Sequence, residues 1–171
     1  GLYKATAEGE AESAIAAAVQ NGYRLIDTAS AYKNEENVGQ GIANCGIPRR
    51  DLFITTKIWN NAQRLGDVEG AFQRSLDRLG LDYIDLYLIH WPVPGCYLST
   101  WKTMEKFLES GKALSIGVSN FEIRHLEELR KVSGIVPAVN QIECHPLCYK
   151  KELIEYCQAN DIQVQAYAPL A

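Results

Sequence analysis

Residues 86–92, with the sequence LYLIHWP, are the most informative stretch of the chain about its fold. The apolar run that opens this stretch has the length of a strand and does not alternate with polar residues. Such runs are typical of a parallel strand that is buried on both faces. The run ends in an imidazole, an indole and a proline, so polar and aromatic groups follow the carboxyl end of the strand. We therefore expect a functional site that begins at His90.

Three other apolar segments have the same layout. Residues 23–27 end in a carboxylate, residues 52–57 end in an ammonium, and residues 114–120 end in a hydroxyl and an amide. Recurrence of this pattern in chain order indicates parallel strands whose carboxyl ends meet at one rim. A β/α barrel has that arrangement.

Predicted helices and strands alternate along the whole chain. The expected helices are 8–21, 34–44, 67–79, 99–110, 122–131 and 150–160. The expected strands are 23–27, 52–57, 84–89, 113–118, 136–142 and 163–167, with a possible further stub at Leu2 and Tyr3. The repeat of helix plus strand implies parallel pairing through right-handed crossovers. No linker interrupts it, so we expect residues 1–171 to form a single partial barrel domain.

The length limits how much of a barrel the chain can form. A closed (β/α)8 TIM barrel needs eight strands and typically about 250 residues, whereas this chain has 171. The fold class is therefore α/β, a (β/α)8 barrel that is incomplete as given. We expect about strands one to seven, counting the stub, without the eighth strand and the C-terminal helices.

Composition excludes several classes of partner. The net charge is -4, both signs are scattered and no basic block occurs, so neither nucleic acid nor a membrane surface is an expected partner. The five cysteines are odd in number and lack the spacing of a disulfide scaffold, and no signal peptide is apparent. A cytoplasmic protein is expected. The chain begins with Gly1 and has no initial Met.

Seven short motifs together resemble the aldo-keto reductase superfamily, and they occur in the family's order and at its intervals. They are GYRLIDTA at 22–29, YKNE at 32–35, TKIW at 56–59, DLYLIHWP at 85–92, GVSNF at 117–121, VNQ at 139–141 and APL at 168–170. Any one of these motifs is a weak signal, but the ordered set is highly specific.

The resemblance implies a nicotinamide-dependent reductase of aldehydes and ketones, of the alcohol dehydrogenase or aldehyde reductase type. Its catalytic tetrad falls on Asp27, Tyr32, Lys57 and His90. Reduction of a carbonyl leaves charge on oxygen, so the site needs a proton donor and a group that orients that oxygen. Tyr32 is the expected acid, and a nearby Lys57 cation is expected to lower the pKa of its phenol. Asp27 pairs with Lys57, and a neutral His90 orients the carbonyl.

The resemblance also implies NADP (NADPH) as the cofactor. Its contacts carry over to Asp27, Ser119, Asn120 and Gln141, and to Tyr167 as a ring stacked on the nicotinamide. Packing at the barrel rim is the competing interpretation of Tyr167. The sequence has no GxGxxG run, so a Rossmann-type pyrophosphate turn is not the expected mode of binding.

Large aromatic residues after the strands suggest the walls of a substrate pocket. Tyr3, Trp59 and Trp91 are the candidates, beside His90, for a small-molecule carbonyl substrate with an apolar body. Core packing is the competing interpretation. The run ECHPLC at 143–148 contains two cysteines and a histidine, but a second pair of ligands is lacking, so no metal is expected.

Two departures from the family bear on function. The chain lacks the C-terminal segment in which the family grips the 2′-phosphate of the cofactor, so NADP over NAD rests on the resemblance alone. An open barrel also leaves unpaired sheet edges. A fragment of a longer protein that is monomeric at full length is expected. The alternatives are a cofactor-binding, regulatory or structural protein on the same scaffold, and an inactive fragment.

Overall fold

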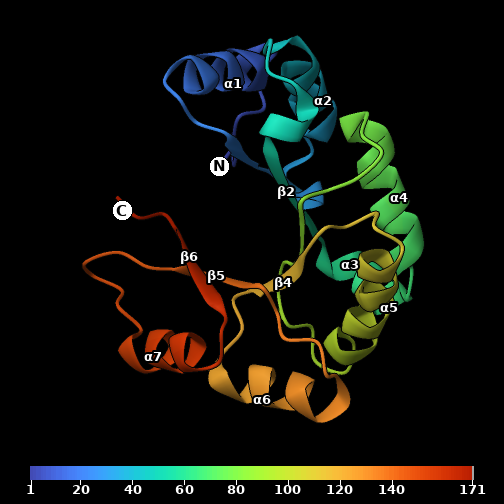
Figure 1. Ribbon diagram of the computed structural model, residues 1–171, viewed down its shortest axis with the longest axis vertical. Coiled ribbons are helices and arrows are strands. Elements are labelled where there is room, and N and C mark those ends of the chain that lie inside the picture. Colours follow the sequence, from blue (N-terminus) through green and yellow to red (C-terminus); the bar gives the residue numbers. More distant parts are fainter. Residues whose placement is uncertain (171) are drawn as a thin grey trace.

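Six parallel strands form one curled sheet in the computed structural model, which describes residues 1–170 of the chain. The strands are β1 (Leu25–Asp27), β2 (Phe53–Ile58), β3 (Leu86–Ile89), β4 (Ile116–Ser119), β5 (Val139–Glu143) and β6 (Gln163–Tyr167). Each pairs in parallel with the next along the chain, in the order β1-β2-β3-β4-β5-β6. The sheet forms an open arc with its helices on the outer side (Figure 1). The expected incomplete (β/α)8 barrel is confirmed.

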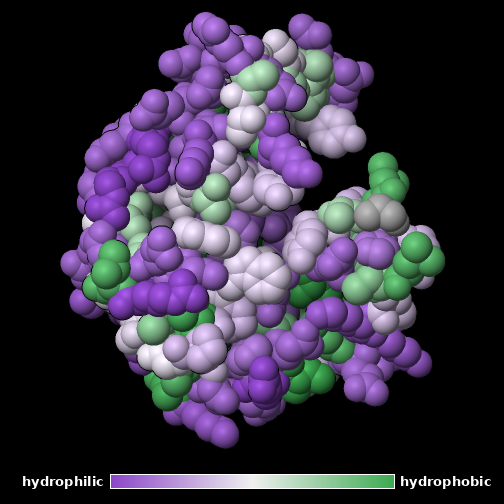
Figure 2. Space-filling view, turned by 180° about the vertical axis from the view of Figure 1, so that it is seen from behind, coloured by the Kyte–Doolittle hydropathy of each residue, from purple (hydrophilic) through white to green (hydrophobic). Residues whose placement is uncertain are grey.

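The N-terminus and the last strand, β6, lie toward the open side of this arc (Figure 1). Seen from behind, the open side is a notch in a mainly hydrophilic surface (Figure 2). None of the helices between residues 1 and 170 combines the length and apolar character that a bilayer span requires.

Seven α-helices lie within residues 1–170; the first precedes β1 and the other six lie between successive strands. They are α1 (Glu10–Gln20), α2 (Glu35–Asn44), α3 (Asn60–Leu65), α4 (Val68–Leu79), α5 (Tyr97–Glu109), α6 (Ile123–Val132) and α7 (Lys151–Ala159). The main core lies between helices and sheet. For example, Phe72 of α4 and Phe107 of α5 stack with ring centroids 4.2 Å apart, and the Tyr87 ring of β3 meets Phe72 edge-on at 4.7 Å.

Alternation along the strands separates this core from the site. Successive side chains of a strand point to opposite faces. In β2, Ile58 joins the core under the helices, whereas Lys57 turns toward the inside of the arc. In β3, Tyr87 joins the same core and Leu88, level with Lys57, faces the inside. A polar side chain near the end of a strand therefore reaches the site only if it occupies one of the alternate positions that face the inside of the arc.

Three sequence-based expectations need correction. The stub at Leu2 and Tyr3 is not a strand. The Leu2 amide donates one hydrogen bond to the Asp27 oxygen at 2.9 Å. The chain then turns away at Lys4, which has a positive φ of 67°. Helix α3 was not expected, since its six residues are too few to show a helical period. Expected strands 23–27, 84–89, 113–118 and 136–142 begin two or three residues later in the structure.

Candidate active site

Lys57 brings the centre of the site together from the end of β2. It is 0% exposed, and its ammonium donates to both carboxylate oxygens of Asp27 and to the backbone oxygen of Thr28, each at 2.9 Å. These three contacts match the three N–H donors of a lysine. The Tyr32 hydroxyl lies at 3.5 Å, which is long for a hydrogen bond. Burial lowers the pKa of Lys57, and the Asp27 carboxylate opposes that shift.

Tyr32 is held next to this pair by a short turn. The chain forms a 3-10 helix at Ser30–Tyr32, directly after β1, and the Ser30 hydroxyl donates to the Lys57 backbone oxygen at 2.9 Å. The Tyr32 ring lies between two other rings, with its centroid 5.1 Å from that of Tyr3 and 5.8 Å from that of His90. The sequence-predicted tetrad of Asp27, Tyr32, Lys57 and His90 therefore converges in space.

The expected effect of Lys57 on the Tyr32 phenol is wrong for this arrangement. Burial raises the pKa of Tyr32 above its ordinary value of 10.0, and the charge of Asp27 raises the pKa further. Burial is the larger cause. The Lys57 ammonium donates to Asp27 and Thr28 at 2.9 Å and lies 3.5 Å from the phenol oxygen, and its charge does not offset the effect of burial. The phenol stays protonated through the neutral pH range.

His90 is fixed through its backbone and kept neutral by its surroundings. Its amide donates to the Ile58 oxygen at 3.3 Å, and its own oxygen accepts from Asn120 Nδ2 at 3.0 Å. Burial and then the positive charge of Lys57 lower the pKa of His90 to about 4. Its buried Nδ1 has no hydrogen-bond partner within residues 1–170. At neutral pH the ring can donate or accept one hydrogen bond at each nitrogen, according to its tautomer.

Four of the five predicted cofactor residues, all except Asp27, lie together at β4, β5 and β6. Asn120 takes a positive φ of 61°, a conformation that Asn tolerates, and donates to Ser119 Oγ at 3.1 Å. Its side-chain oxygen accepts from the Tyr167 hydroxyl at 2.9 Å. Ser119 donates to the Gln141 backbone oxygen at 2.8 Å. These residues thus form one hydrogen-bonded cluster that continues to His90.

Gln141 connects that cluster to the carboxylate of the tetrad. Its Nε2 donates to Asp27 Oδ2 at 2.9 Å and to Gln165 Oε1 at 2.7 Å. Gln141 Oε1 takes part in no hydrogen bond among the described side chains. An amide oxygen in this state is an available acceptor for a ligand N–H group.

The three candidate pocket walls differ in how closely they approach the tetrad. Tyr3 packs against Tyr32, and Trp59 lies edge-on to His90 with centroids 5.1 Å apart. Trp91 follows His90 in the chain, and its backbone oxygen accepts from Gln63 Nε2 at 3.1 Å. Their exposed fractions of 67%, 37% and 43% place all three at the surface, which argues against core packing.

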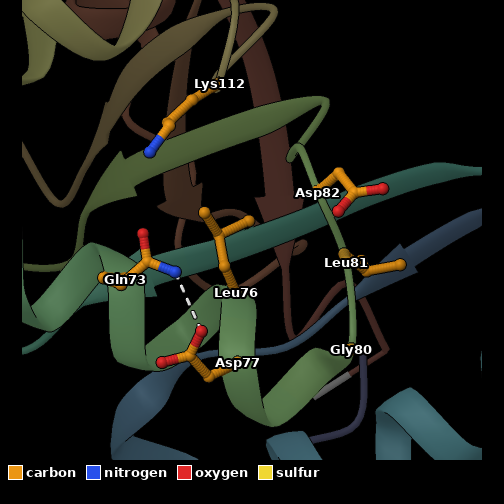
Figure 3. A pocket seen from close by; sticks show the side chains of 7 residues that line it. All are labelled: Gln73, Leu76, Asp77, Gly80, Leu81, Asp82 and Lys112. Atoms are coloured by element: carbon orange, nitrogen blue, oxygen red, sulfur yellow. Dashed lines mark hydrogen bonds between the residues drawn. The ribbon is translucent and has the colours of Figure 1, made fainter.

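Two other features lie outside this cluster. In the loop at 143–148, His145 Nε2 contacts Glu143 at 3.2 Å and the His145 amide donates to the Cys148 oxygen, so the loop is held by its own contacts. A groove of about 350 Å³ lies between α4 and the segments that precede β3 and β4, with Gln73, Asp77 and Lys112 among its lining residues (Figure 3). It is at the amino ends of the strands, opposite the tetrad.

Sequence reasoning missed three amide side chains that support the site. Asn34, Gln63 and Gln165 make the hydrogen bonds that connect its parts. Gln165 could have been found, since it lies two positions before Tyr167 in β6 and therefore faces the same side of the sheet. Asn34 lies within the YKNE motif but, like Gln63, was assigned no role, because a polar residue near the start of a helix is usually exposed.

The fold and the site define a β/α-barrel protein with an ionisable cluster at the carboxyl ends of its strands. Residues 1–171 match the aldo/keto reductase family. A glyoxal reductase of Bacillus subtilis is 51% identical over 170 residues, which cover 99% of this chain and 62% of the relative. This chain belongs to the aldo/keto reductase family.

Solved structures agree with this assignment. An aldo/keto reductase from Brucella melitensis is similar with a TM-score of 0.92 and 48% identity, over 96% of this chain and 65% of that one. An aldo-keto reductase of Bombyx mori, solved in complex with NADP, is similar with a TM-score of 0.90 and 43% identity, over 98% of this chain and 61% of that one. The chain thus spans less than two thirds of the length of these relatives.

Proposed function

We propose that the protein to which this chain belongs reduces aldehydes and ketones to alcohols with NADPH. The observation that carries the proposal is the buried cluster in which Lys57 contacts both Asp27 and Tyr32, with neutral His90 beside the phenol. A proton donor, a charge that polarises the site and an orienting imidazole are the groups that carbonyl reduction requires.

Tyr32 is the proposed proton donor. Its raised pKa keeps the phenol protonated at neutral pH, the form that a general acid needs. The acceptor is the alkoxide oxygen that forms as the carbonyl is reduced. An alkoxide is a stronger base than a phenolate, so the transfer is downhill even from a weakly acidic phenol. Lys57 then stabilises the phenolate left behind, because its ammonium remains within 3.5 Å of that oxygen.

His90 is proposed to orient the substrate. With a pKa of about 4 the ring is neutral at pH 7, and it donates one hydrogen bond to the carbonyl oxygen. Its backbone is held at both the amide and the carbonyl, which limits the movement of the ring. The aromatic rings of Tyr3 and Trp59 form an apolar boundary next to these polar groups, which suits carbonyl substrates with apolar bodies.

The residues at the ends of β4 to β6 fit a nicotinamide ring. A nicotinamide carries a carboxamide with both donors and an acceptor, and Ser119, Asn120 and Gln141 offer short polar side chains of both kinds. The available Oε1 of Gln141 suits the carboxamide N–H, and the Tyr167 ring offers a face for stacking. Bound NADPH supplies the hydride to the carbonyl carbon. The NADP found with the Bombyx mori relative supports the choice of cofactor.

The test is NADPH oxidation by the purified chain with benzaldehyde, compared among three forms. Tyr32→Phe should lower turnover by about 10²-fold or more, with little change in NADPH affinity measured by fluorescence titration. Tyr23→Phe removes a hydroxyl from an exposed tyrosine outside the cluster and should keep full turnover. Near-native turnover of Tyr32→Phe would remove Tyr32 as the acid. NADPH binding without turnover of the unchanged chain would favour a cofactor-binding protein on the same scaffold.

A further inference from the structure

Asn34 joins three segments that meet behind the candidate site. It is 2% exposed and lies just before α2, two residues after Tyr32. Its Nδ2 donates to the backbone oxygens of Leu2 at 2.9 Å and Ala5 at 3.0 Å. Its Oδ1 accepts from the Thr28 hydroxyl at 2.9 Å. One side chain therefore connects the first residues of the chain to the end of β1 and to the loop that carries Tyr32.

The two carbonyls that Asn34 binds are the two ends of one turn. The Ala5 amide donates to the Leu2 oxygen at 3.2 Å, and Tyr3 and Lys4 lie between them. Lys4 has a φ of 67°, which is unfavourable for a residue with a side chain. A strained backbone persists only where its surroundings hold it. Asn34 supplies that restraint, because its amide spans the open side of the turn.

Tyr3 at the tip of this turn packs against the proposed acid. The ring centroids of Tyr3 and Tyr32 are 5.1 Å apart and the rings are tilted by 56°. Yet Tyr3 is 67% exposed, so packing of its own ring holds it only weakly. Its position must come from the backbone of the turn, and Asn34 binds the Leu2 and Ala5 carbonyls at the two ends of that turn.

We propose that Asn34 is a positioning residue that sets the Tyr3 ring against Tyr32 and so fixes one wall of the substrate opening. The proposal rests on the function proposed above and names a residue that controls how substrate is received there. Asn is suited to this position, since it offers two donors to the turn and one acceptor to Thr28 at the same time. An ionised Asp at position 34 would keep the acceptor for Thr28 but would have neither donor for the turn.

Hydrogen exchange of the chain tests the positioning directly. Asn34→Asp keeps the acceptor for Thr28 and removes both donors to the turn. The amides of Leu2, Ala5 and Thr6 should then exchange about tenfold faster, while the amides of β3 keep their rates. Thr28→Val removes the other bond of Asn34 and should leave the exchange of the turn unchanged. Unchanged exchange of the turn in Asn34→Asp, or an equal rise in β3, would overturn the proposal.

A kinetic comparison tests the consequence for substrate. Asn34→Asp and Tyr3→Ala should both raise the KM for benzaldehyde by about two- to tenfold with kcat nearly kept, because a loose wall weakens binding without touching the acid. Tyr3→Ala alters an exposed side chain and leaves the buried contacts intact. An unchanged KM in Tyr3→Ala would overturn the role of the wall. Failure of the proposed function would give a different result. The unchanged chain would then show no turnover, while Asn34→Asp would still speed exchange of the turn amides.

Discussion

At the scale of single residues, the buried Lys57 ammonium dominates the site. A charge without solvent is costly unless it is paired and hydrogen-bonded, and Asp27 and Thr28 satisfy all three of its N–H groups. Burial and the charge of Asp27 nevertheless raise the pKa of Tyr32, so the nearby cation does not make the phenol more acidic than usual. The ion pair therefore holds the geometry of the site more than it acidifies the phenol.

Removing one member of this pair should destabilise the fold strongly. Asp27→Asn leaves the Lys57 ammonium buried without its counter-ion, which should lower the free energy of unfolding by about 3–5 kcal/mol. Lys57→Met in the same chain should recover part of this loss, since no uncompensated charge remains. Urea unfolding of the two single variants and the double variant, followed by circular dichroism, measures the coupling. Strictly additive effects would contradict an interaction between the two groups.

His90 should make stability depend on pH. Its pKa is lowered from 6.5 to about 4 in the folded protein, so between these values the unfolded chain binds more protons than the folded one. Stability is therefore present above pH 6.5 and falls as the pH drops toward 4, by up to about 3 kcal/mol. Urea unfolding at several pH values should show this loss in the unchanged chain and a smaller one in His90→Gln.

The imidazole signals in NMR spectra supply an independent check of His90. The His90 ring should remain neutral until the pH approaches 4. Burial also lowers the pKa of His125, a histidine outside the site. A His90 midpoint near 6.5 would show that the imidazole is solvated and charged more easily than its surroundings indicate. It would also weaken the proposed role of His90 as a neutral donor.

At the scale of elements, a buried carboxylate connects α2, α4 and β2. Glu35, 1% exposed, accepts from Thr56 Oγ1 at 2.7 Å and from Arg78 at 2.8 and 2.6 Å. Thr56 precedes Lys57 in β2 and points to the opposite face. The network thus fixes the outer side of the strand whose inner side carries the ammonium.

Two arginines of α4 allow a matched comparison of this network with a surface ion pair. Arg78→Met leaves Glu35 buried without its cation and should lower the free energy of unfolding by about 2–4 kcal/mol. Arg74→Met removes a partner of Asp67 on the same helix, where both side chains are largely exposed, and should cost less than about 1 kcal/mol. Urea unfolding measures both. Equal effects would mean that Glu35 reaches water once Arg78 is removed.

At the scale of the whole molecule, the sheet has a protected centre and an exposed end. All four residues of β3 are buried, and the strand pairs with β2 and β4. Strand β6 pairs only with β5 among the described strands, and none of its residues is fully buried. Local stability follows buried contacts and paired backbone, so the molecule should open from β6.

Hydrogen exchange should reveal this gradient. Amides of β3 are expected to exchange only through global unfolding, whereas those of β6 should exchange at least about tenfold faster through local opening. Mass spectrometry of exchanged peptides at several urea concentrations separates the two routes, because global opening depends more steeply on urea. Equal rates and equal urea dependence would show that the open arc unfolds as one unit.

Much of the fold could be predicted from local pattern. The continuous apolar run at β3 and the repeated helix-strand rhythm predict a parallel barrel, since the strands of a parallel sheet are buried on both faces. Polar residues at the strand ends pointed to Asp27, Lys57 and His90 because parallel strands bring those ends together. Helix α3 was not predicted, since an element of six residues is too short to show a helical period. The starts of several strands were predicted too early, since the first residues of an apolar run need not pair with a neighbouring strand.

Local pattern therefore establishes the order of the elements and which ionisable residues share the rim. How these residues act on one another follows from their positions in the folded chain. The direction of the Tyr32 pKa shift depends first on burial of the phenol and then on the charge of Asp27 nearby. The contacts of Asn34 join residues about 30 positions apart. Pattern and spacing carry no distances across the chain, and electrostatics and hydrogen bonding depend on those distances.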